Sequence, residues 1–277
     1  MPARLLEATR AALSFAVHRR RRRALAKTIL VGDRKLSNAF RQQGRAFLSR
    51  LATQAGRFGT AEALREGANE VPDWEPLFTQ AALETLSIFE GPISTIARQA
   101  LEAGLRVAMA DLKTTIAFDL KHPKAVAYLE DHGADLVTKI NDTTRSRVRT
   151  IMTQAVDEGW SYNRTAKELK ALYDGFSVGK PQKHIQSRAH LIAVTESGEA
   201  YEHGNMLVGQ ELAAAGLDMQ KSWNSVGDER VSPECRANEA AGWIPLADAY
   251  PSGKDRPLQH PACRCAGLIR LAPDKKA

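Results

Sequence analysis

The sequence predicts a mainly α-helical N-terminal region followed by a small α+β C-terminal domain. Apolar residues recur every three to four positions through the first two thirds of the chain, which is the period of an α-helix. Proline and glycine pairs interrupt this period at several points. Beyond Gly216 the pattern changes to short apolar runs separated by turn residues, which favours strands.

The first 60 residues are predicted to form a basic helical arm with two helices. One helix has an apolar face at Leu5, Ala8 and Phe15 and runs into a block of arginines. A second helix is expected over 36–51, and glycines break the pattern after it.

Residues 61–140 are predicted to form a helical docking region. A helix around Phe78 is expected to end at Gly91-Pro92, because proline removes a backbone donor and glycine favours turns. A stripe of small residues over 96–110 then predicts a closely packed helix that ends before His122-Pro123.

Residues 141–277 are predicted to form the α+β domain. Its helices are expected over 145–156, 165–173 and 191–212, with Gly216 as the cap of the last one. Its strands are expected over 219–226 and 266–271, and a loop over 232–242.

Positive charge is concentrated in the N-terminal arm. Residues 1–60 hold 14 of the 39 Lys and Arg residues but only two of the 32 Asp and Glu residues. Such an arm suits a polyanion, either nucleic acid or an acidic protein surface, and a solvated arm is the simpler alternative. Arginines without interleaved aromatic residues contact phosphates rather than bases. The expected contacts with double-stranded DNA, without sequence preference, are Arg19, Arg20, Arg21, Arg22, Arg23 and Lys27.

The three cysteines lie within the last 43 residues, and their odd number argues against a disulfide framework. Cys263 and Cys265 are one residue apart, so both point to the same side of an extended strand. Together with Cys235 and His260 they offer the ligand types of one structural zinc ion. The alternative is three reduced thiols that pack as small apolar groups.

The sequence gives little support for catalysis. Glu196, Glu199 and His203 share a polar helix face, but a salt-bridged surface explains them as well as a metal site does. The sequence contains no phosphate-binding glycine loop, nucleophile elbow or dinucleotide motif. We therefore predict a protein that is not an enzyme. Its apolar runs are also far shorter than the ~18 to 20 residues of a membrane span, so no span is expected.

A series of short motifs fills the last half of the chain. In order, they are Thr143-Thr144-Arg145, Arg188, Thr195-Glu196, Lys221-x-Trp223, Asp228-Glu229-Arg230-Val231, Pro233-Glu234-Cys235 and the ending His260-Pro-Ala-Cys-Arg-Cys265. This series resembles the Mu F-like minor head protein family of tailed bacteriophages. The resemblance implies that 141–277 is a Mu F-like head morphogenesis domain.

The resemblance also implies structural roles for a set of motif residues. This set consists of Arg188, Thr195, Glu196, Trp223, Asp228, Arg230 and Arg264. Many family members carry a second cysteine where this chain has Ser232. That difference leaves Cys235, His260, Cys263 and Cys265 as the set of four metal ligands.

The function implied is that of a bacteriophage minor head protein that associates with the portal protein and with capsid or scaffold proteins, and contacts packaged DNA. Its expected location is the virion, in the capsid interior or at the portal vertex, and the host cytoplasm during assembly. Two alternatives remain open at this point. One is a metal-dependent nuclease or transferase packaged in the virion, such as a zinc-dependent hydrolase, and the other is a non-specific DNA-binding module.

Overall fold

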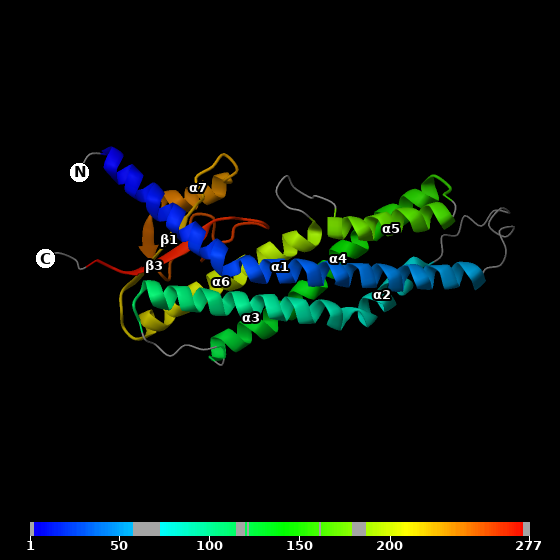
Figure 1. The fold of residues 1–277 in the computed structure, drawn as a ribbon, viewed down its shortest axis with the longest axis horizontal. Coiled ribbons are helices and arrows are strands. Elements are labelled where there is room, and N and C mark those ends of the chain that lie inside the picture. Colours follow the sequence, from blue (N-terminus) through cyan, green and yellow to red (C-terminus); the bar gives the residue numbers. More distant parts are fainter. Residues whose placement is uncertain are drawn as a thin grey trace. The chain divides into compact units, whose positions relative to one another are not determined.

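The computed structural model describes residues 3–57, 73–114, 120, 122–160, 162–178 and 187–273. The described helices are α1 (Ala3–Arg57), α2 (Trp74–Glu84), α3 (Leu86–Asp111), α4 (Pro123–Asp157), α5 (Tyr162–Val178), α6 (Arg188–Ala214) and α7 (Pro233–Ala240). The strands are β1 (Met219–Asn224), β2 (Trp243–Pro245) and β3 (Ala266–Leu271). Helices dominate the N-terminal part and the strands lie near the C-terminus (Figure 1). The predicted fold class is confirmed.

The chain forms two compact units that are discontinuous in sequence. Unit 1 consists of Met1–Leu30, Thr95–Glu130 and Ile192–Ala277, and unit 2 consists of Val31–Ser94 and Asp131–Leu191. The division of the chain into three regions, with boundaries at residues 60 and 140, stays a prediction. None of the described helices combines the length and apolar character that a bilayer span requires.

In unit 1, α3 and α6 pack with almost no space between their backbones. A Cβ atom placed on Gly104 would lie 2.0 Å from the carbonyl oxygen of Tyr201, and one on Gly204 would lie 2.4 Å from that of Leu101. Both positions therefore require glycine, because any side chain would force the helices apart. The close helix packing that the sequence predicted for 96–110 is thus observed at Gly104.

The sheet of unit 1 is antiparallel, with the strand order β2-β1-β3. Lys221 in the central strand pairs with Ile244 on one side and Ile269 on the other. Ile269 lies against α6 at Gly209, where an added Cβ would come within 3.1 Å of it. The sheet face that carries Met219 and Trp223, both buried, is thus turned toward the interior.

Unit 2 has an aromatic core. Phe40 from α1 contacts Phe89 of α3 and Phe176 of α5, with ring centroids 5.1 and 4.9 Å apart. The buried Arg188 guanidinium lies over Phe40 and Phe176, and donates to Thr144 Oγ1 and to the carbonyl oxygen of Ile140. Burial lowers the pKa of Arg188 to about 10, so the guanidinium stays charged at neutral pH and joins α4 to α6.

Several predicted element boundaries were wrong. The two N-terminal helices are one continuous helix, α1. Pro92 lies inside α3 instead of ending a helix, because the buried side chains on both sides of it, including Phe89 and Ile93, keep packing along one face. The predicted loop at 232–242 contains α7, and the short strand β2 was not predicted.

Candidate functional site

The three cysteines form one buried cluster in unit 1. Cys235 lies in the first turn of α7, and Cys263 and Cys265 lie just before β3. All three Sγ atoms are within 4.8 Å of one another, and those of Cys235 and Cys263 are 3.7 Å apart. Each cysteine is at most 3% exposed. The structure therefore brings together three of the four residues that the sequence offered as metal ligands.

Ser232 explains how Cys235 is placed. It is the N-cap of α7, and its side-chain oxygen accepts a hydrogen bond from the Cys235 backbone N–H at 3.2 Å. Pro233 follows at the first helical position, where a backbone N–H would have no partner within the helix, so its absence costs no hydrogen bond. Ser232 thus starts the helix that carries Cys235.

A tight turn places Cys263. The Cys263 N–H donates to the carbonyl oxygen of His260 at 3.0 Å, with Pro261 and Ala262 at the central positions. Ala262 has a φ of 58°, the positive value that the third residue of a type II turn requires. Its N–H donates to Thr195 Oγ1 of α6 at 3.0 Å, so Thr195 holds the turn against the long helix.

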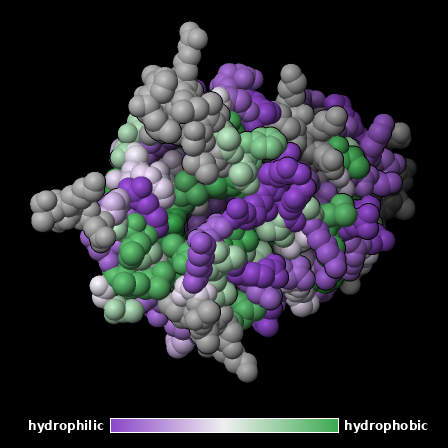
Figure 2. Space-filling view, turned by 60° about the vertical axis from the view of Figure 1, so that its left-hand side comes forward, coloured by the Kyte–Doolittle hydropathy of each residue, from purple (hydrophilic) through white to green (hydrophobic). Residues whose placement is uncertain are grey.

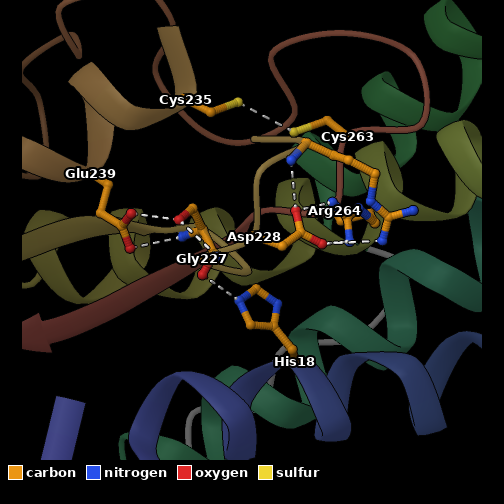
Figure 3. A network of polar contacts seen from close by, with 9 residues as sticks. His18, Gly227, Asp228, Cys235, Glu239, Cys263 and Arg264 are labelled. Carbon is orange, nitrogen blue, oxygen red and sulfur yellow. Dashed lines mark hydrogen bonds and ion pairs between the residues drawn. The ribbon is translucent and has the colours of Figure 1, made fainter. Parts of the chain in front are cut away.

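An ion pair fixes the chain between the two cysteines of this segment. Arg264 donates two hydrogen bonds to the Asp228 carboxylate, at 2.6 and 2.7 Å (Figure 3). Arg230 contacts the same carboxylate at 3.1 Å. The hydrogen bonds from Arg264 are the main reason why the pKa of Asp228 lies far below its usual range. The turn after β1 is therefore tied to the segment that holds Cys263 and Cys265.

The three thiols differ in pKa. The hydrogen bond from the Cys265 thiol is the main cause that lowers the pKa of Cys263, assisted by backbone hydrogen bonds from Gln259 and Cys265. Donating that hydrogen bond raises the pKa of Cys265. Burial raises the pKa of Cys235. Cys263 is thus the first of the three to become a thiolate, which is the form that binds a metal.

His260 does not reach the cluster. Its side chain is exposed, and Nδ1 lies 3.0 Å from the carbonyl oxygen of Pro261. It is close enough to Glu234, the neighbour of Cys235, to lower the pKa of that carboxyl as a minor cause. His260 therefore lies at the rim of the cluster.

Residues 146–268 match the family model described as Phage Mu protein F like protein. The match contains Arg188, the Asp228 turn and the whole cysteine cluster, so the resemblance seen in the sequence is confirmed. The chain carries a Phage Mu protein F like region. No curated protein and no solved structure matches the chain.

The remaining motif residues of the Mu F-like region are mainly buried. Trp223 is 1% exposed and packs edge-to-face on Tyr250, with ring centroids 5.2 Å apart. Glu196 is 7% exposed. His203 stacks on Tyr128 at 4.0 Å. Glu196, Glu199 and His203 thus share a helix that is packed on the interior of unit 1, and these contacts support a structural role for this face.

The arginine block upstream of the Mu F-like region is divided between two helix faces. The Nε atom of Arg21 lies 3.1 Å from Glu202 Oε1, and their side chains are 12% and 1% exposed. Gly198 leaves room for this arginine, since an added Cβ would lie 2.6 Å from its Nη2. Arg20 pairs with Asp111 at the surface. The other members of the predicted DNA contact are exposed, namely Arg19, Arg22, Arg23 and Lys27.

Two further polar residues attach α1 to the Mu F-like region, and the sequence analysis missed them. Ser14 donates to Asn224 Oδ1 at 2.9 Å. His18 Nε2 lies 3.0 Å from the carbonyl oxygen of Ser225, and Figure 3 shows the His18 ring directed toward the turn after β1. Burial lowers the pKa of His18. A carbonyl oxygen can only accept, so the ring nitrogen donates to it. The spacing of Ser14, His18 and Arg21 is that of one helical face, a signal that the sequence does contain.

Proposed function

We propose that this protein is a minor head protein of a tailed bacteriophage, which acts in capsid morphogenesis and associates with the portal and the inner capsid. The observation that carries the proposal is the Mu F-like match, which includes the cysteine cluster and the ion pair that positions it. Burial of the motif residues Trp223, Arg188 and Glu196 supports an assembly role over a catalytic one.

Analysis of purified particles tests this function. We expect the chain in mature particles at a low copy number, in a fixed ratio to the portal ring, and bound to the portal protein when the two are produced together. Particles assembled with the gene deleted should lose infectivity or head integrity. Normal, infectious particles that lack the chain would contradict the proposal.

We also propose that the exposed basic face of α1 contacts double-stranded DNA without sequence preference. Arg19, Arg22, Arg23 and Lys27 are exposed, whereas Arg21 is held by Glu202. Figure 2 shows hydrophilic side chains over much of one face of the molecule, interspersed with hydrophobic ones. A contact that neutralises phosphates needs charge and access, and these four residues have both.

DNA affinity should depend strongly on salt. If the four exposed residues each neutralise one phosphate, log affinity falls against log salt with a slope near −3.6. Changing Arg19, Arg22 and Arg23 to Gln should reduce the slope to about −0.9. The matched control changes Arg98, Arg106 and Arg236, three exposed arginines elsewhere in unit 1, to Gln. Equal losses of DNA affinity in both triple variants would show that the net charge of the protein, and not this face of α1, determines DNA binding.

We further propose that the cysteine cluster holds one structural zinc ion. Zinc–sulfur bonds of about 2.3 Å in a tetrahedron place two sulfurs about 3.8 Å apart, and the Cys235 and Cys263 sulfurs are 3.7 Å apart. His260 is the proposed fourth ligand, because it begins the turn that carries Cys263.

Elemental analysis of the purified protein should give close to one zinc per chain. Cys263→Ser should abolish binding, His260→Ala should weaken it by about 10- to 100-fold, and Ser232→Cys should strengthen it by adding a fourth sulfur. Competition with a chromophoric chelator measures all three. A metal-free protein with reactive thiols would contradict the proposal, and an unchanged affinity in His260→Ala would remove His260 from the ligand set.

A further inference from the structure

The pair formed by Cys235 and Cys263 has a geometry that favours a second kind of bond. Their sulfurs are 3.7 Å apart and not bonded, whereas a disulfide has a sulfur–sulfur distance of about 2.05 Å. The sulfurs would have to approach by about 1.7 Å, a displacement within reach of side-chain rotation. The two cysteines belong to segments that lie 28 residues apart in sequence, namely α7 and the turn before β3.

Cys265 is a poorer partner for either of them. It directly precedes β3, where Ala266 pairs with Asn224 of the central strand, so its backbone is fixed by the sheet. Cys263 and Cys265 are separated by one residue, and extended chain places such residues about 6.6 Å apart at Cα, close to the upper limit for a disulfide. These backbone constraints favour Cys235 and Cys263 as the pair that forms the bond.

We propose that Cys235 and Cys263 form a reversible disulfide when the metal-free protein meets a peroxide. The sulfur of one cysteine attacks an oxygen of hydrogen peroxide and becomes a sulfenic acid, while one water leaves. The sulfur of the other cysteine then attacks this sulfenic acid, its proton leaves with the hydroxyl group as a second water, and the sulfur–sulfur bond forms. Two thiols are oxidised and one peroxide is reduced to two waters.

The disulfide would join the same two segments that the metal joins. Each bond ties α7 to the turn of His260–Cys263, and Asp228 and Arg264 already hold this region together. A reducing cytoplasm keeps such thiols reduced, and an extracellular particle lacks that protection. In an extracellular particle the disulfide would thus keep these two segments of a metal-free chain joined, and this last step alone rests on the proposed function.

Peptide mapping tests the disulfide directly. The protein is treated with a chelator, then with equimolar hydrogen peroxide, and the remaining thiols are alkylated under denaturing conditions. Trypsin cuts after Arg264, which places Cys263 and Cys265 on different peptides, and after Arg230 and Arg236, which isolates Cys235. We expect a loss of about 2 Da, a cross-linked peptide pair containing Cys235 and Cys263, an alkylated Cys265, and reversal by dithiothreitol.

Variants separate this bond from other oxidation products. Cys265→Ser should keep the cross-link, whereas Cys235→Ser should lose it and leave Cys263 open to sulfinic acid. In the wild-type protein, a disulfide between Cys263 and Cys265, or sulfinic acid on individual cysteines in place of a disulfide, would overturn the proposal. A protein that binds no zinc but forms the cross-link would refute only the zinc site, and one that binds zinc but forms no cross-link would refute only the disulfide.

Discussion

Arg21→Gln is expected to lower the free energy of unfolding by up to about 2 kcal/mol at pH 8.5, because the Glu202 carboxyl left without its partner can take up a proton, at a cost set by the difference between pH 8.5 and its pKa of about 7. The remaining charge is Glu202, whose side chain is 1% exposed. One of its oxygens accepts from the Gly267 N–H at 2.9 Å, and the other faces Arg21. Without Arg21, the carboxylate must take up a proton or stay charged in an apolar interior.

The effect of this substitution should decrease at lower pH. Burial raises the pKa of Glu202 to about 7, while Arg21 opposes that rise. Because the folded pKa exceeds the unfolded one, the folded protein binds the proton more tightly, and stability falls as pH rises from about 4.5 through 7. Loss of Arg21 raises the pKa further and extends this fall to higher pH. At pH 5.5 Glu202 is largely protonated in both proteins, so the difference between them should be small.

Urea unfolding at pH 5.5, 7 and 8.5 measures this dependence. Arg22→Gln is the matched control, because it removes the same charge from the next residue, which is exposed, and should change stability by less than about 0.5 kcal/mol. The double variant Arg21→Gln with Glu202→Gln should recover much of the loss at pH 8.5. Equal destabilisation at all three pH values would contradict the role assigned to Glu202.

This ion pair shows where prediction from sequence ends. The helical period contains enough information to place Arg21 and Leu25 on one face of α1, and Arg19, Arg22 and Arg23 on others. It does not reveal that the partner of Arg21 is Glu202, which follows far along the chain in α6. A contact between such distant residues depends on how the helices pack, so the sequence predicted the whole block as a DNA contact.

The helices and strands illustrate the same limit at shorter range. The strand Ala266–Leu271 was predicted with its correct ends, because its apolar residues and preceding cysteines stand out from the turns around them. Helix α7 was missed, although Ser232 and Pro233 form a recognisable helix start. Its eight residues carry only two buried side chains, Cys235 and Asn238, so it lacks the apolar period that revealed the longer helices.

The cysteine cluster was easier to predict than its surroundings. The residue types suggested that Cys235, Cys263 and Cys265 lie together, and their sulfurs do so. His260 was expected at the edge of this group, and it lies exposed beside it, at the start of a turn in which Ala262 adopts a positive φ. Alanine rarely takes this conformation, and here a hydrogen bond to Thr195 helps to hold it.

Trp223→Ala should destabilise the protein by about 3 to 5 kcal/mol, the usual cost of removing a large buried aromatic side chain. Trp223 is 1% exposed and belongs to a buried group that also includes Tyr250, Leu258 and the three cysteines. Its removal would leave a cavity directly beneath the cluster. We therefore also expect the thiols of the variant to react faster with an aromatic disulfide reagent that releases a yellow thiolate.

Trp243→Ala is the matched control for this prediction. Trp243 lies in β2, is only partly buried, and is covered on one face by the Arg270 guanidinium at 4.0 Å. Its loss should cost less than that of Trp223, because surrounding water can fill the space that it leaves. Thermal unfolding and thiol reaction rates of both variants measure the difference. A Trp223→Ala protein that melts like the parent and protects its thiols equally well would show that this tryptophan does not support the cluster, and the motif residue would then have to serve a partner instead.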